Sequence, residues 1–232
     1  MRDIVYFDQS GQEVKDLRVK SNTVFETRVI SGYEQFTGVP ITQVAPMPNI
    51  IQDKGGEPTT GAQYQQNDYQ IAASTFLFNQ NKSNGTAQLY TDGGAQIPKS
   101  ADAQIPNLDP TMVKALTLQE SNGGAKTTDV MQVNVPGDWT SSKSNYGLTK
   151  GTTPDVKTSI NVGIDMLAGK GFKGGITYDP KTGTKSFTFQ GWGAAVNNFN
   201  GGGAAKYGQD YSGSVKTMVD NSKKPVPANY GQ

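Results

Sequence analysis

The segment DPTMVKALTLQESNGG, residues 109–124, decides the expected fold because it contains a helix whose two ends are both marked. Asp109 is a residue type favoured at the N-cap, and Pro110 suits the first helical position. The two glycines at the end of the segment are typical of a helix stop. The segment therefore predicts a helix over residues 110–120.

Glu120 stands at the C-terminal end of one face of this helix. Met112, Leu116 and Glu120 are spaced four residues apart, so they share one stripe of the helix. Apolar surroundings and the negative end of the helix dipole both disfavour the ionised carboxylate, so we expect a raised pKa for Glu120. A carboxyl group that stays protonated near neutral pH can act as the general acid of a glycosidase. Most glutamates at helix ends are solvated surface residues, so this pattern alone does not identify an active site.

The composition removes several classes of enzyme. The chain of 232 residues contains no His and no Cys, which excludes Ser-His-Asp and Cys-His catalysis and zinc sites built on these residues. The formal net charge is +1 and no basic run occurs, so we expect neither nucleic-acid binding nor membrane insertion. No EF-hand-like spacing is present, and we expect no metal and no cofactor. Carboxylates remain for hydrolytic chemistry, and glycosidases need only these.

Four segments resemble, in the same order, segments of one enzyme superfamily. LTLQESNGG (116–124) resembles the Glu-Ser segment of the goose-type lysozyme and lytic transglycosylase superfamily, and DVMQVN (129–134) resembles its Gly-Leu-Met-Gln-Val/Ile motif. AVNNFNGGG (195–203) resembles its Ala-Tyr-Asn-Ala-Gly motif, and GTTPDVKTSINVGIDML (151–167) looks like the helix between these two motifs. Each motif is short, but their common order makes the resemblance specific.

The resemblance implies a role for each matching residue. Glu120 would be the general acid, and Ser121 would fix the loop that follows it. The saccharide would be contacted or enclosed by the remaining motif residues, which are Met131, Gln132, Phe199 and Asn200. Core packing is the simpler interpretation of Met131 and Phe199, and a helix stop is the simpler one of Asn200.

Two departures from the family motif leave the second carboxylate open. Asp129 replaces the motif's Gly, and Asn134 stands where goose-type enzymes place an Asp that positions water, so Asn134 is a candidate substrate-binding residue. An inverting hydrolase needs two carboxyl groups roughly 6.5–9.5 Å apart, for which Asp129 is the first candidate partner of Glu120 and Asp138 the second. A lytic transglycosylase would need Glu120 alone, because the muramic acid 6-hydroxyl is then the attacking group.

Aromatic residues offer further candidates for sugar binding. ITYDPKTGTKSFTF, residues 176–189, predicts a β-hairpin on which Tyr178 lies. The face of Tyr178 could stack on the C–H face of a pyranose ring. Trp139 and Tyr146 are candidates of the same kind, whereas Trp192 lies on an apolar helix face and fits a core better.

We expect a mainly α fold with two parts. Residues 106–232 would form a lysozyme-like helical domain with the small β-hairpin, and residues 1–105 a loop-rich extension with short strands. Apolar periodicity predicts further helices within residues 69–79, from Thr153-Pro154 to Gly169, around residues 192–199 and around residues 211–219.

The leading hypothesis is a muramidase that cleaves the MurNAc–GlcNAc β-1,4 bond of peptidoglycan glycan strands with Glu120 as general acid. The alternatives are a lytic transglycosylase using the same Glu, a non-catalytic peptidoglycan-binding module, and a structural component of a virion or secretion apparatus. The first residues contain no long apolar core of a signal peptide. We therefore expect a bacteriolytic secretion-system effector that reaches the periplasm or cell wall by another route, with an immunity protein as a partner.

Overall fold

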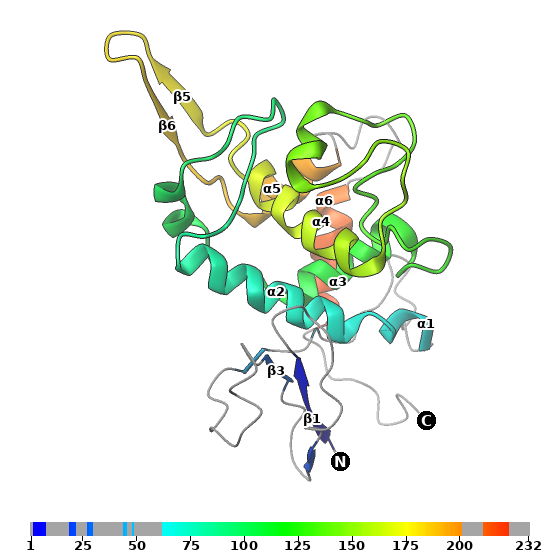
Figure 1. The fold of residues 1–232 in the computed structure, drawn as a ribbon. Helices are drawn as coiled ribbons and strands as arrows, with labels where there is room; N and C mark the ends of the chain where they lie inside the picture. The colour runs from blue at the N-terminus through cyan, green and yellow to red at the C-terminus, as the bar shows by residue number, and fades with distance from the viewer. Residues whose placement is uncertain are drawn as a thin grey trace.

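The chain is mainly helical in a computed structural model (Figure 1). The structure describes residues 62–200 and 211–222, together with Pro48 and the N-terminal strands β1 (Arg2–Phe7), β2 (Val19–Ser21), β3 (Thr27–Val29) and β4 (Val44–Ala45). These strands pair in the order β2-β1-β3-β4, with β1 and β3 parallel and the other pairs antiparallel. Three of them lie in the stretch for which short strands were predicted.

The described helices follow these strands along the chain. They are α1 (Ala62–Gln65), α2 (Asp68–Ser83), η3 (Lys99–Gln104), α3 (Pro110–Ser121), η4 (Ser141–Tyr146), α4 (Val156–Lys170), α5 (Trp192–Phe199) and α6 (Tyr211–Asn221). The predicted hairpin is confirmed, with β5 (Ile176–Asp179) antiparallel to β6 (Thr184–Phe187). In the described part of the chain, no helix has the length and apolar character needed to cross a membrane.

The helices share one core. α4 contacts α2 and α5, α3 contacts α2 and α6, and α5 contacts α6. One cluster of buried apolar side chains extends from Ile71 on α2 to Met218 on α6. It includes Leu89 and Ile97, which lie between α2 and η3. The boundary predicted between residues 105 and 106 therefore runs through this core, and the helical unit begins earlier in the chain than the sequence suggested.

α3 is the helix that the opening segment predicted. The side chain of Asp109 accepts a hydrogen bond from the backbone N–H of Thr111 at 2.8 Å, a cap that contributes about 1 kcal/mol. Pro110 occupies the first turn. Leu116 is fully buried, so the stripe that leads to Glu120 faces the core.

α4 also confirms a predicted helix, but its ends differ from the prediction. Asp155, after the Thr153-Pro154 pair, is the N-cap, and its carboxylate accepts a backbone N–H of the first turn at 2.6 Å. The helix continues through Gly169 to Lys170. Gly169 serves packing here, because a Cβ at this position would lie 2.5 Å from the carbonyl oxygen of Tyr90.

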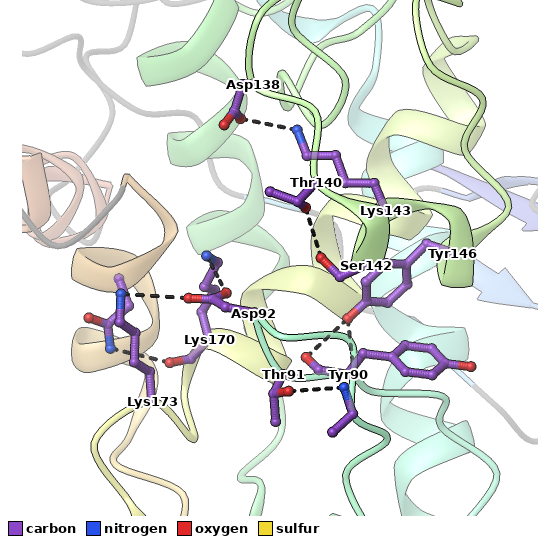
Figure 2. Close-up of polar contacts among 12 residues, drawn as sticks. Tyr90, Thr91, Asp92, Asp138, Thr140, Ser142, Lys143, Tyr146, Lys170 and Lys173 are labelled. Carbon is purple, nitrogen blue, oxygen red and sulfur yellow. Dashed lines mark hydrogen bonds and ion pairs between the residues drawn. The ribbon is translucent and has the colours of Figure 1, made fainter.

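The connection between α2 and η3 is fastened by polar contacts to η4 and to the end of α4 (Figure 2). The Tyr146 hydroxyl accepts the backbone N–H of Tyr90 at 3.1 Å and donates to its carbonyl oxygen at 3.4 Å. Asp92 forms ion pairs with Lys170 at 2.5 Å and with Lys173 at 3.6 Å. Tyr146, a candidate for sugar stacking, therefore has its hydroxyl committed to a contact within the protein.

Candidate active site at the end of α3

α3 ends in a turn built from Asn122 and two glycines. Asn122 takes the left-handed backbone conformation (φ 54°), and the N–H groups of Asn122 and Gly123 donate to carbonyls of the last helical turn at 3.0 Å. Gly124 also has a positive φ, and a Cβ there would lie 2.7 Å from the side chain of Val130. This close approach brings the following segment of the chain beside Glu120.

Glu120 is half-buried between the end of α3 and the start of α6. The hydroxyl of Tyr211, the first residue of α6, donates to Oε1 of Glu120. Ser214 donates to the side-chain oxygen of Gln119 at 3.1 Å, which joins the two helices next to the carboxyl. No hydrogen bond between described residues reaches Oε2 of Glu120. Oε1 is therefore held in place, while Oε2 is left to carry a proton.

The pKa of the Glu120 carboxyl lies above its ordinary value. Burial is the largest cause and raises the pKa, the hydrogen bond from Tyr211 opposes the shift, and the negative charge of Asp129 adds to it. Burial and the charge of Glu120 also raise the pKa of Tyr211, so this phenol stays protonated and remains a donor. The direction expected for Glu120 from the sequence is confirmed.

Residues 129–134 fold into a turn against the end of α3. Gln132 takes the left-handed backbone conformation (φ 51°), and its side-chain amide donates to the backbone carbonyl of Glu120 at 2.5 Å. The hydroxyl of Ser121 donates to the carbonyl of Val130 at 2.8 Å. Both contacts join residues of the first two motifs. The structure therefore brings these motifs together at the residue predicted to be the acid.

Asp129 is buried, and both of its carboxylate oxygens accept hydrogen bonds. Oδ1 accepts from the N–H of Val133 at 2.9 Å and from the hydroxyl of Ser159 at 2.7 Å, and Oδ2 accepts from the N–H of Asn134 at 2.8 Å. A general base must accept a proton from water, yet these oxygens already face buried donors. The geometry favours a structural use of Asp129, and its role as a base stays a prediction.

Met131 and Asn134 make contacts inside the protein. Met131 is fully buried, and a Cβ on Gly163 of α4 would lie 2.5 Å from its sulfur. The Asn134 amide donates to the carbonyls of Thr149 at 2.8 Å and Thr152 at 2.7 Å. Met131 thus packs in the core, as its simpler interpretation held, and Asn134 fastens a neighbouring loop. Their contact with substrate stays a prediction.

The third motif lies on the helix next to α6. Phe199 is the half-buried last residue of α5 and packs against the core, and Asn200 is the C-cap of that helix. No hydrogen bond between described residues joins either side chain to Glu120. α5 contacts α6, the helix that carries Tyr211, so the motif is near the site through the packing of helices rather than through a direct bond.

Two predicted residues lie on other surfaces. Tyr178 is 60% exposed on β5, in a hairpin that projects from the helical body (Figure 1). Asp138 has a side chain that is 72% exposed and forms an ion pair with Lys143 at 3.0 Å, as Figure 2 shows. Neither contacts Glu120 in the described structure. Trp192 donates its N–H to the carbonyl of Pro106 at 3.3 Å and packs against the core, as expected.

Tyr211 is the site residue that the sequence analysis did not single out. It was expected only as part of the apolar face of the last helix. The sequence signal that could have identified it is a Tyr at the start of a helix, because a buried Tyr hydroxyl needs a hydrogen-bond partner. Its partner is 91 positions away in the sequence, so the contact itself could not be read from local pattern.

Comparisons with known proteins add no relative: no family model matches the chain, and no curated protein or solved structure matches it. Within the described ranges, no group of three or more His, Cys, Asp or Glu side chains is arranged to hold a metal ion. The chemistry available at this site is therefore argued from Glu120 and its neighbours.

Proposed function

We propose that the chain cleaves peptidoglycan glycan strands at the MurNAc–GlcNAc β-1,4 bond, with Glu120 as the general acid. The observation that carries the proposal is a shielded carboxyl at the end of α3 with a raised pKa, whose Oε1 accepts a hydrogen bond from Tyr211. Such a group can hold a proton on Oε2 near neutral pH and deliver it to the glycosidic oxygen as the C–O bond breaks.

The convergence of two motif segments supports this proposal. Ser121 and Gln132 both hold the backbone around Glu120, through Val130 and through the carbonyl of Glu120 itself. The resemblance to goose-type lysozymes and lytic transglycosylases requires residues of these types beside the acid. An ordinary surface glutamate at a helix end would have no need of such support.

Tyr211 fits the second half of the reaction. Once Glu120 has given up its proton, the carboxylate must be stabilised until it accepts a proton from the attacking hydroxyl. The Tyr211 hydroxyl donates to Oε1, and a hydrogen bond to an ionised acceptor is stronger than one to a neutral acceptor. Tyr211 therefore favours the state of Glu120 that acts as base in this step.

Purified sacculi provide the test. The wild type should release soluble muropeptides, and Glu120→Gln should reduce the rate at least about 1,000-fold, because the amide cannot donate an acidic proton. Asp92→Asn is the matched control, since it removes a partly exposed carboxylate outside the candidate site and should keep wild-type turnover. Release by the Glu120→Gln variant at the wild-type rate would contradict the proposal. Tight binding of sacculi without release by the wild type would favour a binding module.

A lytic transglycosylase is the second candidate, and the contacts of Asp129 favour it. Both oxygens of the Asp129 carboxylate already accept hydrogen bonds, so this residue does not offer Glu120 a free second carboxylate. A transglycosylase needs no second carboxylate. Mass spectrometry of the products separates the two reactions: reducing muramic acid ends indicate hydrolysis, and 1,6-anhydro ends indicate transglycosylation.

We also propose that the chain is a bacteriolytic effector that acts in the periplasm or cell wall, and that the cell producing it requires an immunity protein. The test is to direct the chain to the cytoplasm or to the periplasm of a bacterial host. Lysis should follow only in the periplasm, and only with Glu120 intact. Lysis that persists in the Glu120→Gln variant would contradict this setting.

A further inference from the structure

Asp129 and Ser159 form a buried polar unit beside the candidate acid. Asp129 is 5% exposed and Ser159 on α4 is 0% exposed. The Ser159 hydroxyl donates to Oδ1 of Asp129 at 2.7 Å and accepts the backbone N–H of Met131 at 3.0 Å. Burial of a carboxylate is costly unless hydrogen bonds offset the lost hydration, so this unit requires the donors that surround it.

The unit accepts hydrogen bonds from four consecutive backbone N–H groups of the turn. Four consecutive donors bond to it, at distances between 2.8 and 3.0 Å: Met131 to the Ser159 hydroxyl, Gln132 to the Asp129 carbonyl, and Val133 and Asn134 to the two Asp129 carboxylate oxygens. The backbone is therefore fixed at each residue of the turn, including the left-handed residue Gln132.

This turn leads directly to the acid. The Gln132 side chain donates to the Glu120 carbonyl from a residue with a left-handed backbone. We propose that Asp129 and Ser159 are positioning residues that build this turn and, through Gln132, hold Glu120 in place. The purpose of the turn, to hold a catalytic acid, rests on the proposed function. The construction of the turn rests only on its observed hydrogen bonds.

The residue type at position 129 fits this role. A carboxylate presents two acceptor oxygens to the N–H groups of Val133 and Asn134 and to the Ser159 hydroxyl. An Asn would turn an NH2 group toward one of these donors, and a Gly, the residue of the family motif, would offer no side-chain acceptor. An Asp at this position therefore supplies the side-chain acceptors from which the turn is built.

The test combines Ser159→Ala and Asp129→Asn with the control Asp92→Asn, which removes a partly exposed carboxylate that pairs with Lys170. Hydrogen exchange of peptides covering residues 129–135 reports on the turn, and kcat, KM and the pH profile on soluble glycan strands report on the acid. Both variants should exchange at least about 10-fold faster in residues 131–134. Both should lower kcat about 10- to 100-fold with KM kept, because the acid is misplaced and not removed. Asp129→Asn should also move the basic limb of the pH profile to lower pH, because it removes a negative charge that raises the pKa of Glu120, whereas Ser159→Ala should leave this limb in place. The control should change neither.

A base role for Asp129 gives a different result. Asp129→Asn would then lower kcat more than about 1,000-fold with unchanged exchange, Ser159→Ala would keep wild-type kcat, and azide would restore turnover to Asp129→Ala. That outcome would overturn the proposal, as would unchanged exchange in both variants. If wild-type protein releases nothing from sacculi while the variants still exchange faster, the proposed function fails and the turn assignment stands.

Discussion

Glu120 and Asp129 are two shielded carboxyl groups on either side of one turn, and they are held in opposite ways. In the described part of the chain, Glu120 receives one side-chain hydrogen bond, from Tyr211. Asp129 receives three, from two backbone N–H groups and the Ser159 hydroxyl. Burial favours the protonated form of Glu120, whereas the three donors around Asp129 fix that side chain in place. The number and kind of donors thus separate the proposed acid from the scaffold that holds it.

The largest expected effect on stability is at Asp129. Asp129→Ala removes the acceptor of three buried donors, so the free energy of unfolding should fall by about 3 kcal/mol. Urea denaturation followed by circular dichroism measures this. Asp138→Ala, at an exposed carboxylate, should stay within about 0.5 kcal/mol of the wild type. A loss below about 1 kcal/mol at Asp129 would break the comparison, because the carboxylate would then not be holding the turn.

Asp165 on α4 tests whether a raised pKa alone makes an acid. Burial raises the pKa of Asp165 from 3.8 to about 7, and Lys99 opposes the shift. When folding raises the pKa of a carboxyl, ionisation of that carboxyl destabilises the folded protein. This destabilisation is absent below the ordinary pKa and complete above the pKa in the folded protein. Asp165→Asn should therefore raise the thermal unfolding temperature at pH 8, with no gain at pH 3. Turnover should be unchanged, and a loss comparable to that of Glu120→Gln would contradict our placement of the site.

Tyr211→Phe sharpens the description of Glu120. The Tyr211 hydrogen bond lowers the pKa of Glu120, so its removal should raise that pKa further. The basic limb of the kcat/KM profile, where the acid loses its proton, should move to higher pH. At the optimum, kcat should fall roughly 10-fold because the anion formed in the reaction loses a donor. A basic limb that stays in place would show that Tyr211 does not act on the titrating group.

Glu120→Gln should give the smallest change in stability. The raised pKa means that ionised Glu120 destabilises the native state, and this cost grows as pH rises from the ordinary glutamate pKa through the folded pKa. The variant should therefore unfold at a slightly higher temperature than the wild type at pH 8, with no gain at pH 3. A clear loss of stability at pH 8 would indicate that Glu120 is a structural residue like Asp129.

Local signals in the sequence predicted the helices, but contacts between residues distant in the sequence were not predicted. α3 was predictable because Asp109, Pro110 and the closing glycines mark its ends within one short segment. The end of α4 was not, because Gly169 is required by the close approach of the carbonyl of Tyr90 from another part of the chain. The early start of the helical unit was missed for the same reason, since the buried residues between α2 and η3 follow no period.

The residues of the candidate site show the same difference between local signals and distant contacts. Residue types and motif order pointed to Glu120, Ser121 and Gln132, which the structure brings together. Sequence showed that an Asp stands at position 129, but not that its oxygens accept hydrogen bonds from Val133, Asn134 and Ser159. Tyr211 was missed because only the packing of α6 on α3 brings its hydroxyl to Glu120.

The central claim is that Glu120 is the group whose proton drives glycan cleavage, and its titration tests this most directly. The carboxyl 13C resonance of Glu120, assigned by its loss in the Glu120→Gln variant, gives the pKa of this group in the free enzyme. We predict a value above that of an ordinary glutamate, coinciding with the basic limb of the wild-type kcat/KM profile. An ordinary pKa, with turnover that continues unchanged at pH values where Glu120 is fully ionised, would contradict the account.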